Sequence, residues 1–410
     1  MVRKFYNFKK IQKHAHSIIP GLSGLLGKRP EMYLPGGKWP TYYSKAKGIN
    51  LWDLNGKKYL DFTMIGVGSC VLGYSDPDIN KVAIKAINQS PLTTLNPLEE
   101  VELAEMLLDI HSWAEQVKYA RTGGEMMAVA VRLARAATRK DKILFCGYHG
   151  WHDWYLSTNI NSEDKLKDHL LPGLEPLGVP KNLDNTVIPF RFNNYDDFKN
   201  IVQVNAKDCA AIIIEPARDR LVHAKFLQGI RRVASENNCV LIFDEITSAW
   251  RNQTSGIHKE LGINPDLAAF GKTIANGIPM ACLIGKRDIM EYYTKTFISS
   301  TNWTERLGPA CSIAFIKKHR KLNIGKILKE KGKAIRNIWE KSAKNANLDI
   351  EINGILPLSS FKIKHQEWPA IITYFIQEML KKDILASDRC YSNYCQDTKS
   401  LKIYEESCLR

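Results

Sequence analysis

Short runs of hydrophobic residues alternate with longer stretches of helical periodicity along the middle of the chain. Three of these runs, at 142–145, 211–214 and 240–243, are continuously apolar rather than alternating, apart from Lys142 at the start of the first. Continuous apolar runs are typical of strands that are buried on both faces. Helical periodicity runs through 99–110 and 124–138. Because helices separate the strands, the pattern predicts an α/β core with a mostly parallel sheet.

The two ends of the chain have other patterns. Prolines interrupt residues 1–45, which predicts an arm with little regular structure. Residues 48–62 read as two short strands around an Asn-Gly turn, a strong hairpin signal. Lysine-rich helical sequence covers 309–347, and an amphipathic helix is predicted at 398–410.

These changes of pattern predict three parts of the chain. They are an N-terminal arm and hairpin that join a small domain (1–65), a large α/β domain (66–300) and a smaller C-terminal α+β domain (301–410).

Composition and charge narrow the class of protein. With 410 residues, 44% hydrophobic and 25% charged, the chain has an ordinary globular composition and room for two domains. No apolar stretch reaches the length of a membrane span, and no long apolar segment follows the charged N-terminus, so we expect a cytoplasmic protein. The net charge of +15 is spread along the chain without a nucleic-acid motif, which favours solvated helix faces over a nucleic-acid partner.

The nine cysteines are scattered and include no CxxC pair. Several lie in apolar stretches, as Cys70, Cys239 and Cys282 do. This pattern favours buried, reduced thiols over a disulfide framework.

A lysine and an acid at strand ends carry the strongest chemical signal. Asp244 directly follows an apolar run, and Lys272 lies in Phe270-Gly271-Lys272 among small residues. A buried lysine has a lowered pKa and supplies the neutral amine that attacks an aldehyde. A carboxylate at a strand end can pair with a protonated pyridine nitrogen. Taken alone, Asp244 also fits a helix cap and Lys272 a surface turn.

Three further segments fit a ligand that has an aldehyde, a pyridine ring and a phosphate. Arg121-Thr122-Gly123-Gly124-Glu125 precedes a helix and offers amides and a hydroxyl to a phosphate, although it also fits a plain turn. Tyr148 follows a strand and could stack on a flat ring, and Glu215 ends another strand with a carboxylate. Cys146, His149 and His152 would suggest zinc, but no fourth ligand is evident, so we predict no metal.

With these residues in place, the chain resembles the class III aminotransferases of pyridoxal phosphate (PLP) fold type I, and within them the glutamate-1-semialdehyde aminomutase-like branch. The likeness runs from Leu51 to about residue 320 and is weaker beyond. The matching motifs are the Gly-Gly-Glu helix start, Tyr148-His149-Gly150, Ile214-Glu215-Pro216, Asp244-Glu245-Ile246 and Phe270-Gly271-Lys272.

The resemblance implies a role for each matching residue. Lys272 would bond to PLP and later move a proton, and Asp244 would pair with the pyridine nitrogen. Tyr148 would stack on the ring, near Glu215. The residues that would hold the phosphate are Thr122, Gly123 and Gly124, together with Thr301 reaching across a homodimer.

The chain departs from the family pattern at two places. Arg121-Thr122-Gly123-Gly124 replaces the usual Asn-Ser-Gly-Thr/Ser loop, so one phosphate hydroxyl is missing at Gly124. The segment 303–306 replaces a stretch of small residues near the substrate. The candidates for substrate contact are Arg121, Trp303, Glu305 and Arg306, with a structural ion pair as the alternative for the last two.

The resemblance therefore implies a PLP-dependent aminotransferase. It would move an amino group from an amino acid donor to a polar aldehyde or ketone, such as a sugar-derived carbonyl for surface glycans. Two alternatives stay open: a glutamate-1-semialdehyde 2,1-aminomutase, and a non-catalytic binding protein on the same fold.

Overall fold

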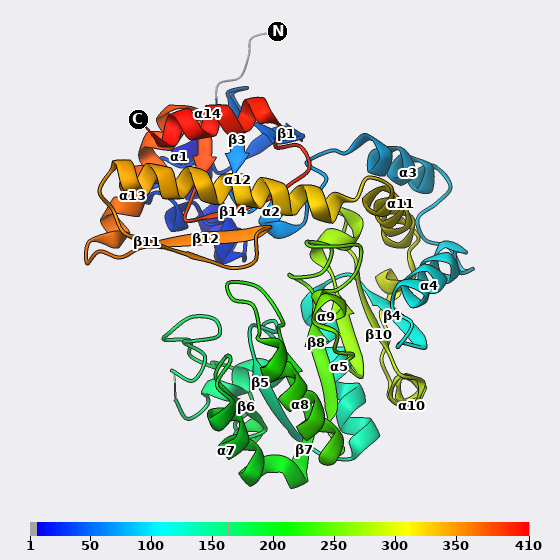
Figure 1. Ribbon diagram of the computed structural model, residues 1–410. Helices are drawn as coiled ribbons and strands as arrows, with labels where there is room; N and C mark the ends of the chain where they lie inside the picture. Colours follow the sequence, from blue (N-terminus) through cyan, green and yellow to red (C-terminus); the bar gives the residue numbers. More distant parts are fainter. Residues whose placement is uncertain (1–5, 163, 410) are drawn as a thin grey trace. The chain divides into compact units, whose positions relative to one another are not determined.

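The computed structural model describes residues 6–162 and 164–409 (Figure 1). This part of the chain forms two compact units. One unit runs to Asn80 and resumes at Lys326, and the other covers Lys81–Gly325. These limits lie C-terminal to the domain boundaries predicted at residues 65 and 300, which stay predictions.

The larger unit is built on a seven-stranded sheet. Across the sheet the strands are β4 (Gln116–Ala120), β10 (Ala281–Gly285), β9 (Leu267–Phe270), β8 (Val240–Asp244), β7 (Cys209–Ile214), β5 (Lys142–Cys146) and β6 (Val187–Pro189). Only β10 pairs antiparallel with its neighbours, so the prediction of a mostly parallel sheet is confirmed.

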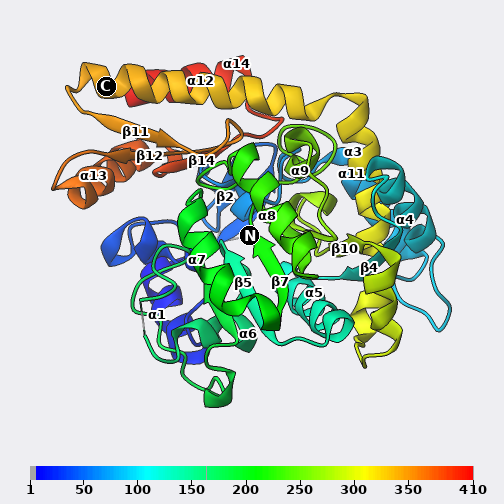
Figure 2. The same cartoon turned by 60° about the horizontal axis from the view of Figure 1, so that its bottom comes forward.

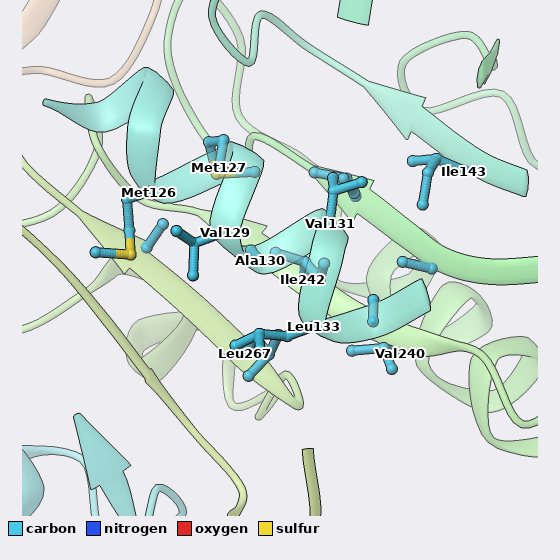
Figure 3. Close-up of a cluster of buried hydrophobic side chains, with 14 of the residues drawn as sticks. Met126, Met127, Val129, Ala130, Val131, Leu133, Ile143, Val240, Ile242 and Leu267 are labelled. Carbon is cyan, nitrogen blue, oxygen red and sulfur yellow. The ribbon is translucent and has the colours of Figure 1, made fainter. Parts of the chain in front are cut away.

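Both faces of this sheet are buried, as the continuous apolar runs predict. Ile143, Ile242 and Leu267 belong to a core that packs under a helix (Figure 3). Their neighbours Leu144 and Leu241 point to the opposite face and are equally inaccessible to solvent. A strand in the middle of such a sheet has no polar face to present, which explains its sequence.

The helices of the larger unit cover these faces. Helix α8 packs against β7 and β8 and lies in front of the strands in Figure 2. The helices are α4 (Glu99–Ile110), α5 (Gly123–Thr138), α6 (Asp153–Leu156), α7 (Tyr195–Asn205), α8 (Ala224–Glu236), α9 (Ile257–Leu261), α10 (Arg287–Met290) and α11 (Leu307–Lys321). The helical periodicity at 99–110 and 124–138 is thereby confirmed.

The smaller unit holds two short sheets. One has the order β1 (Tyr43–Lys47), β2 (Asn50–Asp53), β3 (Lys58–Phe62) and β13 (Ile384–Ala386), and the other has β11 (Ile350–Asn353), β12 (Leu358–Ile363) and β14 (Arg389–Tyr391). Its helices are α1 (Phe8–Ile18), α2 (Ile65–Gly68), α13 (Trp368–Lys381) and α14 (Thr398–Cys408). The predicted hairpin is the antiparallel pair of β2 and β3.

Two helices cross from one unit to the other, α3 (Pro77–Asn88) and α12 (Ile324–Asn345). The lysine-rich stretch predicted at 309–347 is therefore two helices, α11 and α12, with a break at Asn323, whose φ is +48°. The arm is more regular than predicted, because α1 forms before the first proline and the Asn7 side chain caps it by accepting from the Lys10 amide at 3.1 Å.

All nine cysteines are free thiols, and seven of them are buried. Within residues 6–162 and 164–409, no helix combines the length and the apolar character needed to cross a membrane.

Candidate functional site

The strand ends of the larger unit bring the candidate residues to one edge of the sheet. The parallel strands β5, β7, β8 and β9 run the same way, and so does β4, since both β4 and β9 pair antiparallel with β10. Residues that end these strands or follow them closely therefore lie at the carboxyl edge, where open α/β sheets bind ligands. They are Arg121, Tyr148, Glu215, Asp244 and Lys272.

Asp244 is the last residue of β8 and is only 2% exposed. The Nδ1 atom of His149 lies 2.8 Å from one carboxylate oxygen of Asp244. The backbone amide of Ile246 donates to the other oxygen at 3.1 Å. These two contacts fix the orientation of the carboxylate. They therefore also set the directions in which its remaining lone pairs can accept a hydrogen bond.

Lys272 begins a short 3₁₀ helix (Lys272–Ala275) directly after β9. Its φ of +45° is a left-handed conformation that a side chain rarely adopts and that is typical of functional sites. The amine donates to the Thr247 hydroxyl at 2.8 Å. Burial lowers the pKa of Lys272 to about 8, and the nearby carboxylate of Glu215 only partly opposes this effect.

Glu215 and Tyr148 are joined through the loop that follows β5. The backbone amide of Tyr148 donates to the Glu215 carboxylate at 3.3 Å. Burial raises the pKa of Glu215, while the Arg218 guanidinium, 3.5 Å from the same oxygen, acts to lower it. Arg218 also lies over the Tyr148 ring, 5.9 Å from its centre. The aromatic face of Tyr148 is thus held beside a buried carboxylate and a cation.

Helix α5 begins at the predicted phosphate loop. Thr122 caps the helix, and its hydroxyl donates to Glu125 at 2.9 Å within a capping box. Gly123 and Gly124 occupy the first helical positions, whose amides have no acceptor inside the helix and are suited to an anion.

The two glycines also pack closely against neighbouring side chains. A Cβ at Gly123 would lie 2.6 Å from the Ile246 side chain, so a larger residue there would have to displace it. A Cβ at Gly124 would lie 3.1 Å from the His152 ring, a contact that requires the ring to move. Ile246 and His152 therefore leave little space for a larger side chain at either position.

Arg121 holds the segment 303–305 rather than facing open solvent. Its Nε lies 2.7 Å from the Glu305 carboxylate, and its NH2 atom donates to the carbonyls of Trp303 and Glu305 at 3.0 and 2.8 Å. The Trp303 indole donates to Glu125 at 3.3 Å. The structure therefore gives these three substrate candidates partners within the fold, and their contact with substrate stays a prediction.

Arg306 also has a partner, since its guanidinium lies 2.7 Å from Glu99. The sequence left a structural ion pair open for Glu305 and Arg306, and each of them forms one, although not with the other. Thr301 is exposed at the start of the 3₁₀ helix Thr301–Thr304, and its role toward a second subunit stays a prediction.

Three groups beside the site were not assigned from the sequence. His149 was considered only as a metal ligand, yet it contacts Asp244; within the described residues, no group of three or more His, Cys, Asp or Glu side chains could hold a metal ion. Thr247 and the buried pair of Glu245 with His258, at 2.8 Å, were given no role from the sequence, although Glu245 lies in one of the matching motifs. Their positions depend on loop conformation, which periodicity does not predict.

Known proteins are similar in sequence to this chain over most of its length. A family model described as "Aminotransferase class-III" matches residues 34–371. A 3-aminobutyryl-CoA aminotransferase from Cloacimonas acidaminovorans is 30% identical over 361 residues, or 85% of this chain and 82% of the relative. A glutamate-1-semialdehyde 2,1-aminomutase from Sulfurisphaera tokodaii is 31% identical over 334 residues, or 79% and 78% of the two chains.

The fold is shared as well. The crystal structure of an omega-transaminase from Sphaerobacter thermophilus superposes with a TM-score of 0.86, covering 98% of this chain and 96% of that one at 20% identity. At that identity the likeness concerns the fold alone, and it agrees with the mostly parallel sheet.

Proposed function

Since this chain belongs to the class III aminotransferases, which are PLP-dependent enzymes, we propose that it moves an amino group from an amino acid donor to a polar aldehyde or ketone. The observation that carries the proposal is the buried lysine of lowered pKa, Lys272, at the same sheet edge as the oriented carboxylate of Asp244. The amides of Gly123 and Gly124 at the start of α5 have no acceptor inside the helix and fit a phosphate, so the residues present fit PLP.

Each residue has a distinct task in this proposal. Bound PLP supplies a reactive carbonyl carbon and a ring that accepts electrons when a Cα proton leaves the substrate. Lys272 provides the amine and carries that proton, because its lowered pKa leaves the neutral form accessible near neutral pH. Asp244 stabilises a positive charge on the ring nitrogen, and Tyr148 offers its aromatic face. The amides of Gly123 and Gly124 would hold the phosphate.

The lowered pKa predicts how the lysine responds to pH. The rate at which Lys272 reacts with PLP should rise about tenfold per pH unit below pH 8 and level off above it, because only the neutral amine attacks. An exposed lysine would continue to gain rate to about pH 10.4. Stopped-flow absorbance of PLP-free protein mixed with PLP measures this profile, with Nα-acetyl-lysine as the control. A midpoint near pH 10 would contradict the assignment.

The proposed reaction is tested by its two halves. The PLP-loaded protein is mixed with single amino acids, and the oxo acid and the pyridoxamine form are quantified by mass spectrometry. The aminated protein is then offered polar aldehydes and ketones, and recovery of the PLP absorbance is followed. A protein that binds PLP but forms no oxo acid from any amino acid donor would overturn the proposal.

A sugar-derived carbonyl for surface glycans is the proposed acceptor. This finer statement rests on the segment 303–306, which departs from the small residues usual in the family. Nucleotide-linked keto sugars belong in the acceptor panel for this reason. Turnover of simple aliphatic aldehydes with no turnover of keto sugars would exclude this acceptor class. We also keep a cytoplasmic location as a proposal.

The aminomutase is the second candidate, favoured by the likeness to a glutamate-1-semialdehyde 2,1-aminomutase over 79% of this chain. Such an enzyme needs no separate donor. Supplying glutamate-1-semialdehyde to the pyridoxamine form separates the two activities, because 5-aminolevulinate would appear without an amino acid. The non-catalytic alternative predicts neither product, while ligand binding would persist.

We further propose a homodimer in which Thr301 reaches the partner subunit's phosphate site. The segment before α4 is unusually apolar at its surface, with Leu95 81% and Leu98 66% exposed. Its Pro91 carbonyl accepts from the Arg306 amide at 2.9 Å, which ties it to the segment that follows Thr301. A second copy covering these leucines would therefore lie close to Thr301.

The dimer proposal predicts the effect of a charge at Leu95. Leu95→Asp should reduce the mass in solution from twice to once the 46.6 kDa of one chain, because a carboxylate cannot be buried unpaired in an apolar interface. Leu177→Asp is the matched control, since Leu177 is 82% exposed and lies in another loop. Light scattering after size exclusion gives both masses. A wild-type protein with the mass of one chain would refute the dimer.

A further inference from the structure

The contact between Lys272 and Thr247 joins two neighbouring strand ends. The Lys272 amine follows β9, and Thr247 lies in the turn after β8, with 2.8 Å between Nζ and Oγ1. Thr247 is only 4% exposed, so water does not compete freely for its hydroxyl. A buried hydroxyl at this distance is a fixed partner for the amine rather than a chance surface contact.

The turn that carries Thr247 is fixed from both sides. The buried guanidinium of Arg251 donates to the Thr247 carbonyl at 3.1 Å. On the other side, the Glu245 carboxylate accepts from the His258 ring and amide, both at 2.8 Å, and from the Ser248 hydroxyl. Because Glu245 is fully buried, these contacts are protected from solvent, and they hold the turn in one conformation.

The lysine side of the contact is fixed as well. Its left-handed φ costs free energy, so the surrounding structure must favour the conformation that directs the side chain toward Thr247. The adjoining residues Thr273 and Ile274 are fully buried and anchor this short helix. The backbone around Thr247 and the backbone around Lys272 are therefore each held by their own contacts, and together they bring the two side chains into contact.

We propose that Thr247 is a positioning residue, whose hydroxyl holds the Lys272 amine at those stages of the reaction when that amine is not bonded to the cofactor. This inference rests on the proposed function for its catalytic consequence, but the contact itself does not. A hydroxyl suits the task because it accepts from an N–H of the ammonium and can donate to the lone pair of the neutral amine. The lysine is thus held in both protonation states while it gives and takes the proton.

Two variants separate the hydroxyl from the shape of the side chain. Thr247→Val keeps the branched shape and removes the hydroxyl, whereas Thr247→Ser keeps the hydroxyl and removes a methyl group. Thermal unfolding of both variants establishes that each is folded. The comparison is made on the PLP-free protein and again on the PLP-loaded protein.

The first measurement needs no catalysis. Competitive acetylation of the PLP-free protein at several pH values, with Lys272 followed by peptide mass spectrometry, reports how readily the amine loses its proton. Removing an acceptor that stabilises the ammonium should make Lys272 of Thr247→Val react about threefold faster or more at pH 7. Thr247→Ser should match the wild type. Equal profiles for wild type and Thr247→Val would overturn the proposed contact.

The second measurement addresses the reaction. In the single half-reaction with a working amino acid donor, Thr247→Val should be about tenfold slower or more, with PLP affinity within about threefold of wild type. Thr247→Ser should recover most of that rate. Equal losses in both variants would overturn the role of the hydroxyl. If the wild type gives no half-reaction, the proposed function fails, while the acetylation profile still decides whether Thr247 holds Lys272.

Discussion

Replacing Lys272 with alanine should abolish covalent attachment of PLP and lower the rate of amino transfer by about 10⁴-fold or more. The residue supplies both the amine that bonds to the cofactor and the base that moves the proton, so no neighbouring group restores either task. Borohydride reduction followed by peptide mapping shows whether PLP is attached at residue 272. Rates of the half-reaction with an amino acid donor give the loss of activity.

The same substitution should leave the fold at least as stable. The protein lowers the pKa of Lys272 to about 8, so at pH values below 8 the folded state holds this proton less favourably than the unfolded chain does. Removing the charge removes that cost. Lys286→Ala is the control, because its amine lies 2.6 Å from Asp266 and is exposed. Attached PLP in the Lys272→Ala protein, or full activity, would refute the assignment of the lysine.

Asp244→Asn is expected to have the second largest effect, slowing the half-reaction by about 10²- to 10³-fold. The amide keeps the shape of the side chain but has no negative charge to stabilise a protonated ring nitrogen. His149 and the Ile246 amide, which now donate to the carboxylate, would also lose one acceptor. Single-turnover rates and PLP affinity, measured side by side, distinguish weaker catalysis from weaker binding.

A buried carboxylate elsewhere in the sheet provides the control for this variant. Asp266 is 5% exposed and pairs with Arg231 at 2.8 Å. It precedes β9, at the edge of the sheet opposite to Lys272. Asp266→Asn should lower thermal stability and leave the half-reaction rate unchanged. If Asp244→Asn retained the wild-type rate within about threefold, Asp244 would have no electrostatic role.

The layered core was predictable because burial on both faces leaves a continuous apolar run in the sequence. β5, β7 and β8 were found in this way, and their directions placed Tyr148, Glu215 and Asp244 at one edge. The start of α5 was equally visible, since a threonine and two glycines precede the helical periodicity at 124–138, and the structure adds a capping box there. These signals are local, and each needs only a few neighbouring residues.

The partners of the polar side chains were not predictable in the same way. Arg121 looked like a substrate residue in the sequence, and in the structure it pairs with Glu305, far along the chain. No prediction was made for Thr247 from the sequence, and the fold places it against Lys272. Such contacts depend on rotamers and on loop paths that bring distant segments together. Neither of these leaves a periodic pattern of hydrophobic and polar residues in the sequence.

Gly124 makes substitutions in this loop depend on the residue at position 152. The resemblance implies a threonine or serine there, and a single substitution would supply the missing hydroxyl. A new Cβ, however, would lie 3.1 Å from the His152 ring, so the ring would have to shift by a few tenths of an ångström to admit it. The effect of a substitution at residue 124 therefore depends on the residue at 152, and a directed-evolution library of this loop should vary the two positions together.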